Sequence, residues 1–170
     1  RRQQQRKNFA AAVFFSTAYY NITGLSGVVV GSRSPWVEAI CLRNGAKKVE
    51  FRYEGKFDFI ISFSSIEHSG LGRYGDPLDP IGDIREMQKI WCLLKDNGLV
   101  FLGLPTGIDS IYFNVHRIYG EIRLPMMFEG FDLLDIFYGR NPNPINLCTQ
   151  YFHVNCGSQY VYVLRKQKSS

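Results

Sequence analysis

Several signatures of common protein classes are missing from this chain, and each missing signature argues against a class. The 170 residues include four cysteines but no Cys-x-x-Cys pair, the spacing typical of zinc ribbons and thioredoxin-like redox sites. They contain no Gly-x-Gly-x-x-Gly fingerprint, which argues against a nicotinamide-dependent oxidoreductase. They also lack internal repeats and low-complexity linkers, so we expect one folded domain.

The cysteines favour free thiols. Cys41 and Cys92 fall inside apolar helical patterns, where a thiol behaves as a small hydrophobe, so a reducing compartment, the cytoplasm, is favoured. Cys148, His153 and Cys156 could ligate zinc, but no fourth ligand stands at a recognisable spacing. We therefore expect structural roles for these three side chains and no metal site.

Long apolar runs are missing as well. The apolar stretch Phe9–Tyr20 has only twelve residues and carries Ser16 and Thr17, whereas a bilayer needs ~20 residues. We therefore expect no membrane span in this chain. The sequence begins with Arg1 rather than methionine, so a signal or anchor upstream stays an open alternative.

The formal net charge of +5 does not indicate a nucleic-acid-binding surface. In the body of the chain thirteen basic residues stand against fifteen acidic ones, so the body is about neutral. The other basic residues lie in the two tails, at Arg1, Arg2, Arg6, Lys7, Arg165, Lys166 and Lys168. No aromatic residues interleave with them as stacking platforms for bases, and we expect no nucleic-acid partner.

From Leu25 onward, short β-branched runs alternate with longer helical periods, which is the pattern of an α/β fold. Gly27–Gly31 is typical of a strand buried on both faces. Ser34 suits the N-cap of the helix that follows, Pro35 suits its first position, and Gly45 suits its end.

Similar patterns predict the remaining elements. We expect a central strand over Phe57–Phe63, a helix over Ile84–Leu94 that Asn97-Gly98 stops, a strand over Leu99–Leu104, a helix around Asn114–Tyr119, and extended segments over Phe131–Phe137 and Gln159–Leu164. The last two segments are expected to pair antiparallel near one edge of the sheet.

Three loops are expected to lie at one edge of this sheet, because each follows the carboxyl end of a strand. In open parallel sheets this is the edge where ligands bind. The loops are residues 31–35 (GSRSP), 64–68 (SSIEH) and 105–107 (PTG). Gly31 alone is a weak cofactor signal, because a tight turn explains it equally well.

The most specific segment is FDFIISFSSIEHSGLGRYGDPLDPIGDIREMQKIWCLLKDNGLVFLGLP. It is similar to class I S-adenosylmethionine (SAM) methyltransferases, in which a strand beginning Phe-Asp ends near Glu-His, a helix carries an Arg-Glu pair, and a Leu-Lys-x-x-Gly turn opens a strand ending in Pro. Residues 25–165 as a whole resemble a nematode-rich family of uncharacterised methyltransferase-like proteins, which also share SPWVEA and FNVHRIYG.

The resemblance implies a cofactor site and an acceptor site at the expected edge. The cofactor residues it implies are Gly31, Ser32 and Pro35, facing the methionine part of SAM, and Ser64 and Ser65, beside the bound cofactor. Beside the acceptor it implies Glu67 and His68.

The pair Glu67 and His68 has chemistry of its own. It could serve as a general base or bind a metal, because imidazole titrates near neutrality and a carboxylate can orient it. Asp76 and Asp79 could add carboxylates. The alternative is structural, with Glu67 capping the following loop and His68 filling a polar gap.

A second candidate pair is His116 and Arg117, which could hold an anionic group of a substrate bidentately. The alternative for this pair is the start of a solvated helix.

One part of the methyltransferase pattern is missing. In that pattern the second strand ends in an acid that binds the ribose hydroxyls, and a helix, a third strand and another helix precede the Phe-Asp strand. Only eight residues stand between Lys48 and Phe57, fewer than a parallel crossover needs. Either Val49–Tyr53 is a strand followed by a hairpin, or these residues link the first helix directly to the Phe57 strand, beside the first strand. We infer that the adenosine-binding half is absent, with Glu50 or Glu54 as substitutes for the ribose acid.

The sequence thus predicts an α/β fold of the Rossmann-like class I methyltransferase type. This is a three-layer sandwich whose mostly parallel sheet carries an antiparallel terminal strand and has lost the region between strands 2 and 4. We expect a basic and apolar segment over residues 1–24 and the methyltransferase-like domain over 25–170. Because the lost region exposes a sheet edge, we expect an oligomer or a partner to cover it.

Two functions stay open. The first is methyl transfer from SAM to a small-molecule acceptor, with His68 as base and Glu67 orienting it. The second is a catalytically inactive pseudoenzyme of the same fold that acts as a binding or regulatory module.

Overall fold

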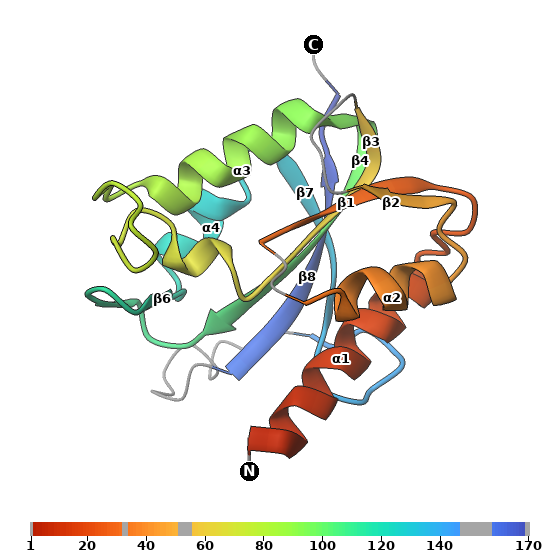
Figure 1. The fold of residues 1–170 in the computed structure, drawn as a ribbon, viewed down its shortest axis with the longest axis horizontal. Coiled ribbons are helices and arrows are strands. Elements are labelled where there is room, and N and C mark those ends of the chain that lie inside the picture. The colour runs from red at the N-terminus through yellow and green to blue at the C-terminus, as the bar shows by residue number, and fades with distance from the viewer. Residues whose placement is uncertain (1, 32–33, 51–55, 147–157, 169–170) are drawn as a thin grey trace.

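A six-stranded sheet forms the middle layer of the molecule and carries helices on both faces (Figure 1). The computed structural model describes residues 2–31, 34–50, 56–146 and 158–168. The strands of the sheet are β1 (Ser26–Val30), β2 (Lys48–Glu50), β3 (Phe57–Phe63), β4 (Leu94–Thr106), β7 (Phe131–Phe137) and β8 (Ser158–Lys166). The helices are α1 (Arg2–Tyr19), α2 (Trp36–Arg43), the short 3-10 helix η1 (Ile66–His68), α3 (Gly82–Leu93) and α4 (Arg123–Met127). A separate hairpin pairs β5 (Ser110–Tyr112) with β6 (His116–Ile118).

The strands lie in the order β2-β1-β3-β4-β8-β7. The first four of these strands run parallel to one another. The last strand of the chain, β8, runs antiparallel to both β4 and β7. This is the mostly parallel sheet with an antiparallel terminal strand that the sequence predicts. The predicted pairing of the last two extended segments is confirmed.

Both faces of the sheet are buried, which is why β3 (FDFIISF) is mostly apolar and carries apolar side chains on both faces. Ile60 points into the core under α3, where it joins Met87 and Ile90 of that helix. Its neighbour Phe59 belongs to the core on the other face, which includes Val13 of α1. Figure 1 shows α1 and α2 on one side of the sheet and α3 and α4 on the other. Each fully buried side chain of this size contributes ~1.5–3 kcal/mol.

The sheet lacks the strand and helices that the methyltransferase pattern places between its second strand and the Phe-Asp strand. β2 and β3 both run parallel to β1, on opposite sides of it, and six residues separate Glu50 from Phe57. The predicted hairpin is therefore wrong, because β1 lies between the two strands. The Phe57 strand lies beside the first strand, as the alternative expected, but Val49 and Glu50 form part of β2 rather than a linker. Of the predicted strand Val49–Tyr53, residues 51–55 lie outside the described part of the chain.

The predicted helix around Asn114–Tyr119 is wrong. This stretch forms the turn and second strand of the β5–β6 hairpin, with Tyr112 paired to His116. Asn114 occupies the turn with a positive φ of 56°, a conformation that asparagine tolerates and a helix does not contain. The apolar spacing of the segment matched a helix, but pairing with β5 decided its conformation.

Two helix ends also differ from expectation. α2 begins at Trp36 with Pro35 at the N-cap position and no side-chain cap, so the predicted N-cap at Ser34 is wrong. Gly45 ends this helix as predicted, with a positive φ of 88°. α3 ends at Leu93, before the predicted stop at Asn97-Gly98, because Leu94 already has the extended backbone of β4.

The N-terminal helix α1 packs against the sheet, with Ala12 and Val13 buried in the core on that face. Its aromatic Phe9 lies against Phe63 of β3, with 5.7 Å between the ring centroids. Within the described ranges, no helix combines the length and the apolar character that crossing a bilayer would take.

Gly27 offers a test of how tightly β1 and β3 are packed. An added Cβ would lie 2.3 Å from the ring of Phe59, its partner across the two strands, and that ring is fully buried. We expect Gly27→Ala to lower the free energy of unfolding by about 1–3 kcal/mol, the usual effect of overpacking. Urea denaturation measures it. In a Phe59→Leu background the cost should fall by more than half, and an equal cost in both backgrounds would show that the ring is not the obstacle.

Candidate functional site

The turn after β1 and the loop after β3 touch one another at the carboxyl ends of the two strands. Gly31 follows β1 with a positive φ of 77°, and a Cβ added there would lie 1.7 Å from the Oγ atom of Ser65. Glycine is therefore needed here for two reasons: it adopts the positive φ without strain, and it leaves room for the side chain of Ser65. The predicted meeting of these two loops is confirmed at Gly31 and Ser65, whereas residues 32–33 lie outside the described part of the chain.

A hydrogen-bonded chain of polar side chains runs from β8 to η1. Gln159 Nε2 donates to Ser64 Oγ over 2.9 Å, and Ser64 Oγ donates to Glu67 Oε1 over 2.8 Å. Glu67 is only 1% exposed. Its second oxygen, Oε2, has no hydrogen-bond partner among the described residues, and neither has Gln159 Oε1. Buried polar atoms of this kind are rare and often mark a place where a ligand or water binds.

Burial changes the acidity of Glu67. It raises the pKa of this carboxyl from 4.5 to about 7, and the hydrogen bond from Ser64 opposes the shift without cancelling it. The carboxyl therefore titrates near neutral pH, where an ordinary glutamate is fully ionised.

The imidazole of His68 is held by its Nδ1 atom, which donates to the carbonyl oxygen of Val115 over 2.5 Å. In the neutral ring this leaves Nε2 unprotonated, 3.7 Å from Glu67 Oε1. Partial burial lowers the pKa of His68, and the nearby charges of Arg73 and His116 lower it further. His68 is thus neutral at pH 7, with Nε2 free to accept a proton.

His68 faces a cavity of about 440 Å³. Ser65 lines the cavity on one side, and the loop from Ser69 to Asp79 and the first turns of α3 line the rest. The volume lies within the ~300–1,000 Å³ that is usual for small-molecule sites. Ser65, which lies against Gly31, therefore connects the cavity of the base candidate to the turn after β1.

The carboxylates Asp76 and Asp79 organise the loop that borders this cavity. Asp76 accepts hydrogen bonds from the N–H groups of Tyr74, at 3.2 Å, and Gly70, at 2.7 Å, and these bonds lower its pKa. Asp79 forms an ion pair with Arg85, at 2.7 Å. Both aspartates line the same cavity as His68, but the oxygens of Asp76 bind the loop itself and those of Asp79 bind the start of α3.

The structure separates the second candidate pair. The side chain of His116 is half-buried, and its ring centroid lies 6.3 Å from that of His68. Arg117, the next residue, is fully buried and donates to the carbonyl oxygens of Ser69, at 2.6 Å, and Asp79, at 3.2 Å. In this arrangement the guanidinium holds the 69–80 loop and is not presented to solvent.

Sequence reasoning missed Asp83, the buried carboxylate under the site. It is 0% exposed and accepts a bidentate pair of hydrogen bonds from Arg123, at 2.6 and 2.8 Å, and a third from Tyr119. Burial alone would raise its pKa, but the hydrogen bonds from Arg123 and the charge of Arg117, 3.6 Å away, outweigh burial and lower it. The available signal was its spacing, since Asp83 falls on the buried stripe of α3 four residues before Met87.

The remaining cofactor candidates are less well placed. Pro35 stands at the start of α2, beyond the Gly31 turn. Glu50 forms an ion pair with Lys48 on its own strand, at 2.9 Å, and pairs with Val28, two residues short of the end of β1. Other candidates lie outside the described residues, namely Ser32, Glu54 and the three residues weighed as zinc ligands, Cys148, His153 and Cys156.

Comparison with known proteins identifies both a family and a fold. Residues 50–167 match the family described as Caenorhabditis protein of unknown function, DUF268, a match that starts later than the residue 25 inferred from the sequence. No curated protein sequence matches the chain.

The fold is that of SAM-dependent methyltransferases. The chain superposes on the 1,6-didemethyltoxoflavin-N1-methyltransferase of Burkholderia thailandensis, solved with S-adenosylhomocysteine, with a TM-score of 0.63 and 13% identity over 98% of this chain and 82% of that one. For the N-methyltransferase NodS of Bradyrhizobium japonicum the TM-score is 0.55, with 10% identity over 98% of both chains. For an O-methyltransferase family protein of Burkholderia thailandensis it is 0.61, with 10% identity over 95% of this chain and 55% of that one. The predicted class I methyltransferase-type architecture is confirmed, and the modest TM-scores agree with a truncated version of it.

The raised pKa of Glu67 predicts a pH dependence of stability. The folded carboxyl keeps its proton up to about pH 7, whereas the unfolded one loses it near 4.5, so the stability that this group contributes at low pH is lost as pH rises between these values. We expect wild-type protein to lose about 2–3 kcal/mol of unfolding free energy relative to Glu67→Gln between pH 5 and pH 8. Urea denaturation at both values measures this.

The comparison with the variant is needed because two histidines change stability in the opposite direction. The pKa values of His68 and His116 are lowered, so the stability that they contribute is lost as pH falls below 6.5. Glu121→Gln, at an exposed position, serves as the control and should leave the pH dependence unchanged. The same pH dependence in Glu67→Gln and wild type would show that Glu67 is ionised in the folded state.

The buried carboxylate under the site can be tested separately. Asp83→Asn would leave Arg117 and Arg123 without their counter-ion, so we expect it to lower the free energy of unfolding by about 3–5 kcal/mol. The exposed pair of Asp132 and Arg165 provides the control, since Asp132→Asn should cost less than ~1 kcal/mol. Equal costs in the two variants would mean that burial of Asp83 contributes nothing.

Proposed function

Because the chain belongs to the family described as Caenorhabditis protein of unknown function, DUF268, and shares the methyltransferase fold, we propose that it binds SAM and methylates a small nucleophilic acceptor. One observation supports this most directly. His68, whose Nε2 atom is unprotonated in the neutral ring, lines a cavity beside the turn that ends β1, where a base could meet both cofactor and acceptor.

The residues present fit one end of SAM and leave the other open. Near the end of β3, Ser62 Oγ and Glu67 Oε2 are buried without a hydrogen-bond partner within the described residues and could satisfy polar groups of the methionine end. Gly31, Ser64 and Ser65 would border that end. At the end of β2, Glu50 pairs with Val28, two residues short of the end of β1, which argues against it as the ribose carboxylate.

When bound, SAM supplies a methyl group on a positively charged sulfur, an electrophile that needs only a nucleophile in line with it. His68 would take the proton of an acceptor O–H or N–H at Nε2 while the acceptor bonds to the methyl carbon. The Val115 carbonyl holds the ring by Nδ1. An ionised Glu67, 3.7 Å from Nε2, would stabilise the imidazolium that forms.

A second candidate function is binding without catalysis. It is favoured by the side chain of Ser65, which fills the space directly over Gly31, and by the loss of the region that follows β2. A pseudoenzyme would keep the cavity as a binding surface for a small molecule. The two candidates differ in whether any acceptor is methylated.

Methyl transfer tests the first candidate. Wild-type protein incubated with SAM carrying a labelled methyl group and a panel of small O- and N-nucleophiles should label at least one acceptor, and His68→Ala should lower that rate by ~10²–10⁴-fold. Calorimetric titration with S-adenosylhomocysteine should give the same affinity for both proteins, since His68 acts on the acceptor. Glu121→Gln, remote from the cavity, is the control for the rate.

The pH profile adds a second readout. The rate should rise as Glu67 ionises at about pH 7, and Glu67→Gln should lose that rise. Equal turnover by wild type and His68→Ala would remove His68 from the reaction. Binding of S-adenosylhomocysteine with no labelled acceptor would favour the non-catalytic candidate.

A further inference from the structure

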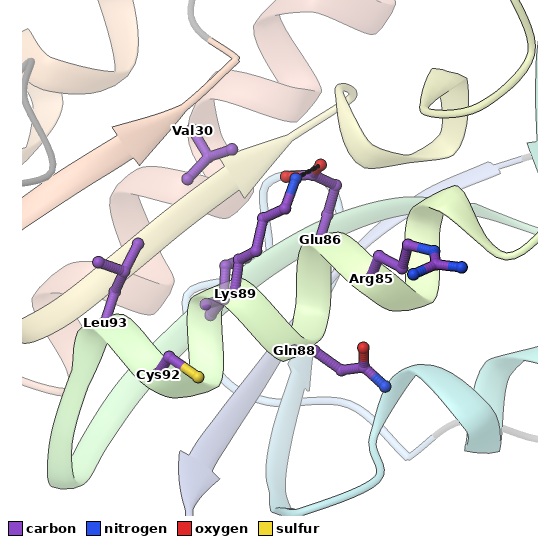
Figure 2. A pocket seen from close by; sticks show the side chains of 8 residues that line it. Val30, Arg85, Glu86, Gln88, Lys89, Cys92 and Leu93 are labelled. Carbon is purple, nitrogen blue, oxygen red and sulfur yellow. Dashed lines mark hydrogen bonds and ion pairs between the residues drawn. The ribbon is translucent and has the colours of Figure 1, made fainter. Parts of the chain in front are cut away.

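A groove of about 710 Å³ runs along α3 beside the end of β1 (Figure 2). Its wall is one side of α3 together with Val30, the residue that precedes Gly31. Arg85, Glu86 and Lys89 line both this groove and the cavity that holds His68, so the two spaces adjoin. The groove therefore begins at the candidate site and leads away from it.

The missing region explains why this groove is open. In the methyltransferase pattern a helix, a strand and another helix stand between the second strand and the Phe-Asp strand, whereas here six residues stand there. Among the described residues, α3 has no helical neighbour over β1 and β2 on its face of the sheet (Figure 1). Val30 and Leu93 are left half-buried rather than covered.

The polar side of the groove is a carboxylate and an ammonium group on α3. Glu86, Lys89 and Leu93 are spaced three and four residues apart, which places them on one face of the helix. Figure 2 shows that the Glu86 carboxylate and the Lys89 ammonium meet on the side of α3 that faces Val30. Their atoms Oε1 and Nζ lie 2.6 Å apart.

We propose that this groove binds the adenosine part of SAM, with Glu86 replacing the ribose-binding acid that the sheet has lost. The inference rests on the proposed function, because it takes SAM as the ligand. A carboxylate can accept hydrogen bonds from both hydroxyls of a vicinal diol, and a charged acceptor makes each bond stronger than a neutral one would. The half-buried Val30 and Leu93 offer apolar contact to a flat base.

Geometry favours Glu86 over the carboxylates that the sequence suggested. Each carboxylate is paired to a lysine of its own element, Glu50 to Lys48 and Glu86 to Lys89, so position decides between them. Glu50 pairs at the level of Val28, whereas Glu86 lines both the groove and the cavity beside the Gly31 turn. With the methionine end at the turn, the nucleoside would extend along α3 toward Cys92. The occupant is thus a nucleoside joined to a charged amino acid, in one continuous site.

Two readouts test the proposal without any acceptor. Calorimetric titration with S-adenosylhomocysteine should show affinity for wild type that falls about tenfold to a hundredfold in Glu86→Gln, as expected for losing hydrogen bonds to a charged group. Cys92 lines the groove and is exposed, so bound S-adenosylhomocysteine should slow its alkylation by iodoacetamide. Mass spectrometry of the peptide that contains Cys92 measures this, and the protection should be lost in Glu86→Gln.

Glu121→Gln is the matched control and should keep both the affinity and the protection of Cys92. If wild type binds S-adenosylhomocysteine but Glu86→Gln binds it equally well and Cys92 stays unprotected, the adenosine lies elsewhere and the proposed function survives alone. If wild type shows no binding, both the proposed function and this inference are overturned. If Glu86→Gln is unfolded by circular dichroism, Val30→Trp, which would fill the groove, must abolish binding and leave Cys92 alkylation insensitive to the ligand.

Discussion

The seating of Ser65 against Gly31 is the contact on which the candidate site depends, because it joins the ends of two parallel strands. A side chain at residue 31 would push the β3 loop away from the β1 turn. Behind this contact, η1 turns Glu67 inward and leaves His68 at the rim of the cavity. Neighbouring residues thereby acquire opposite surroundings, and burial moves the carboxyl pKa toward neutrality while it keeps the imidazole neutral.

A second layer of interactions holds that loop in place. Asp83 and Arg117 are fully buried charges, which cost free energy unless they are paired and hydrogen-bonded. Arg117 reaches from β6 to the carbonyl oxygens of the 69–80 loop, and Arg123 closes the pair on Asp83 from α4. The loop that borders the cavity is thus tied to two elements distant in sequence, β6 and α4. Such an arrangement favours a preorganised wall over a mobile one.

The loss of the region after β2 has opposite effects on stability and binding. It leaves β2, a strand of three residues, at the edge of the sheet, with only one described strand beside it. It also opens the groove along α3, next to the site rather than far from it. In our proposal the nucleoside lies in this groove, on the face of the sheet, rather than at the end of the second strand. We therefore regard the truncation as a change in where a ligand would lie.

The sequence by itself determined the class of the fold. A mostly apolar strand such as Phe57–Phe63 has apolar side chains on both faces, and these are buried only when helices cover both faces of the sheet. It also determined that the 64–68 loop meets the Gly31 turn, since parallel strands end at one edge. It did not determine the conformation of residues 114–119. Their apolar spacing fits a helix, but pairing with β5 makes residues 116–118 a strand. Nor did it show that Arg117 is buried, that Asp83 is its partner, or that Glu86 borders an open groove. Those features depend on which distant segments come together, and local propensity carries no information about that.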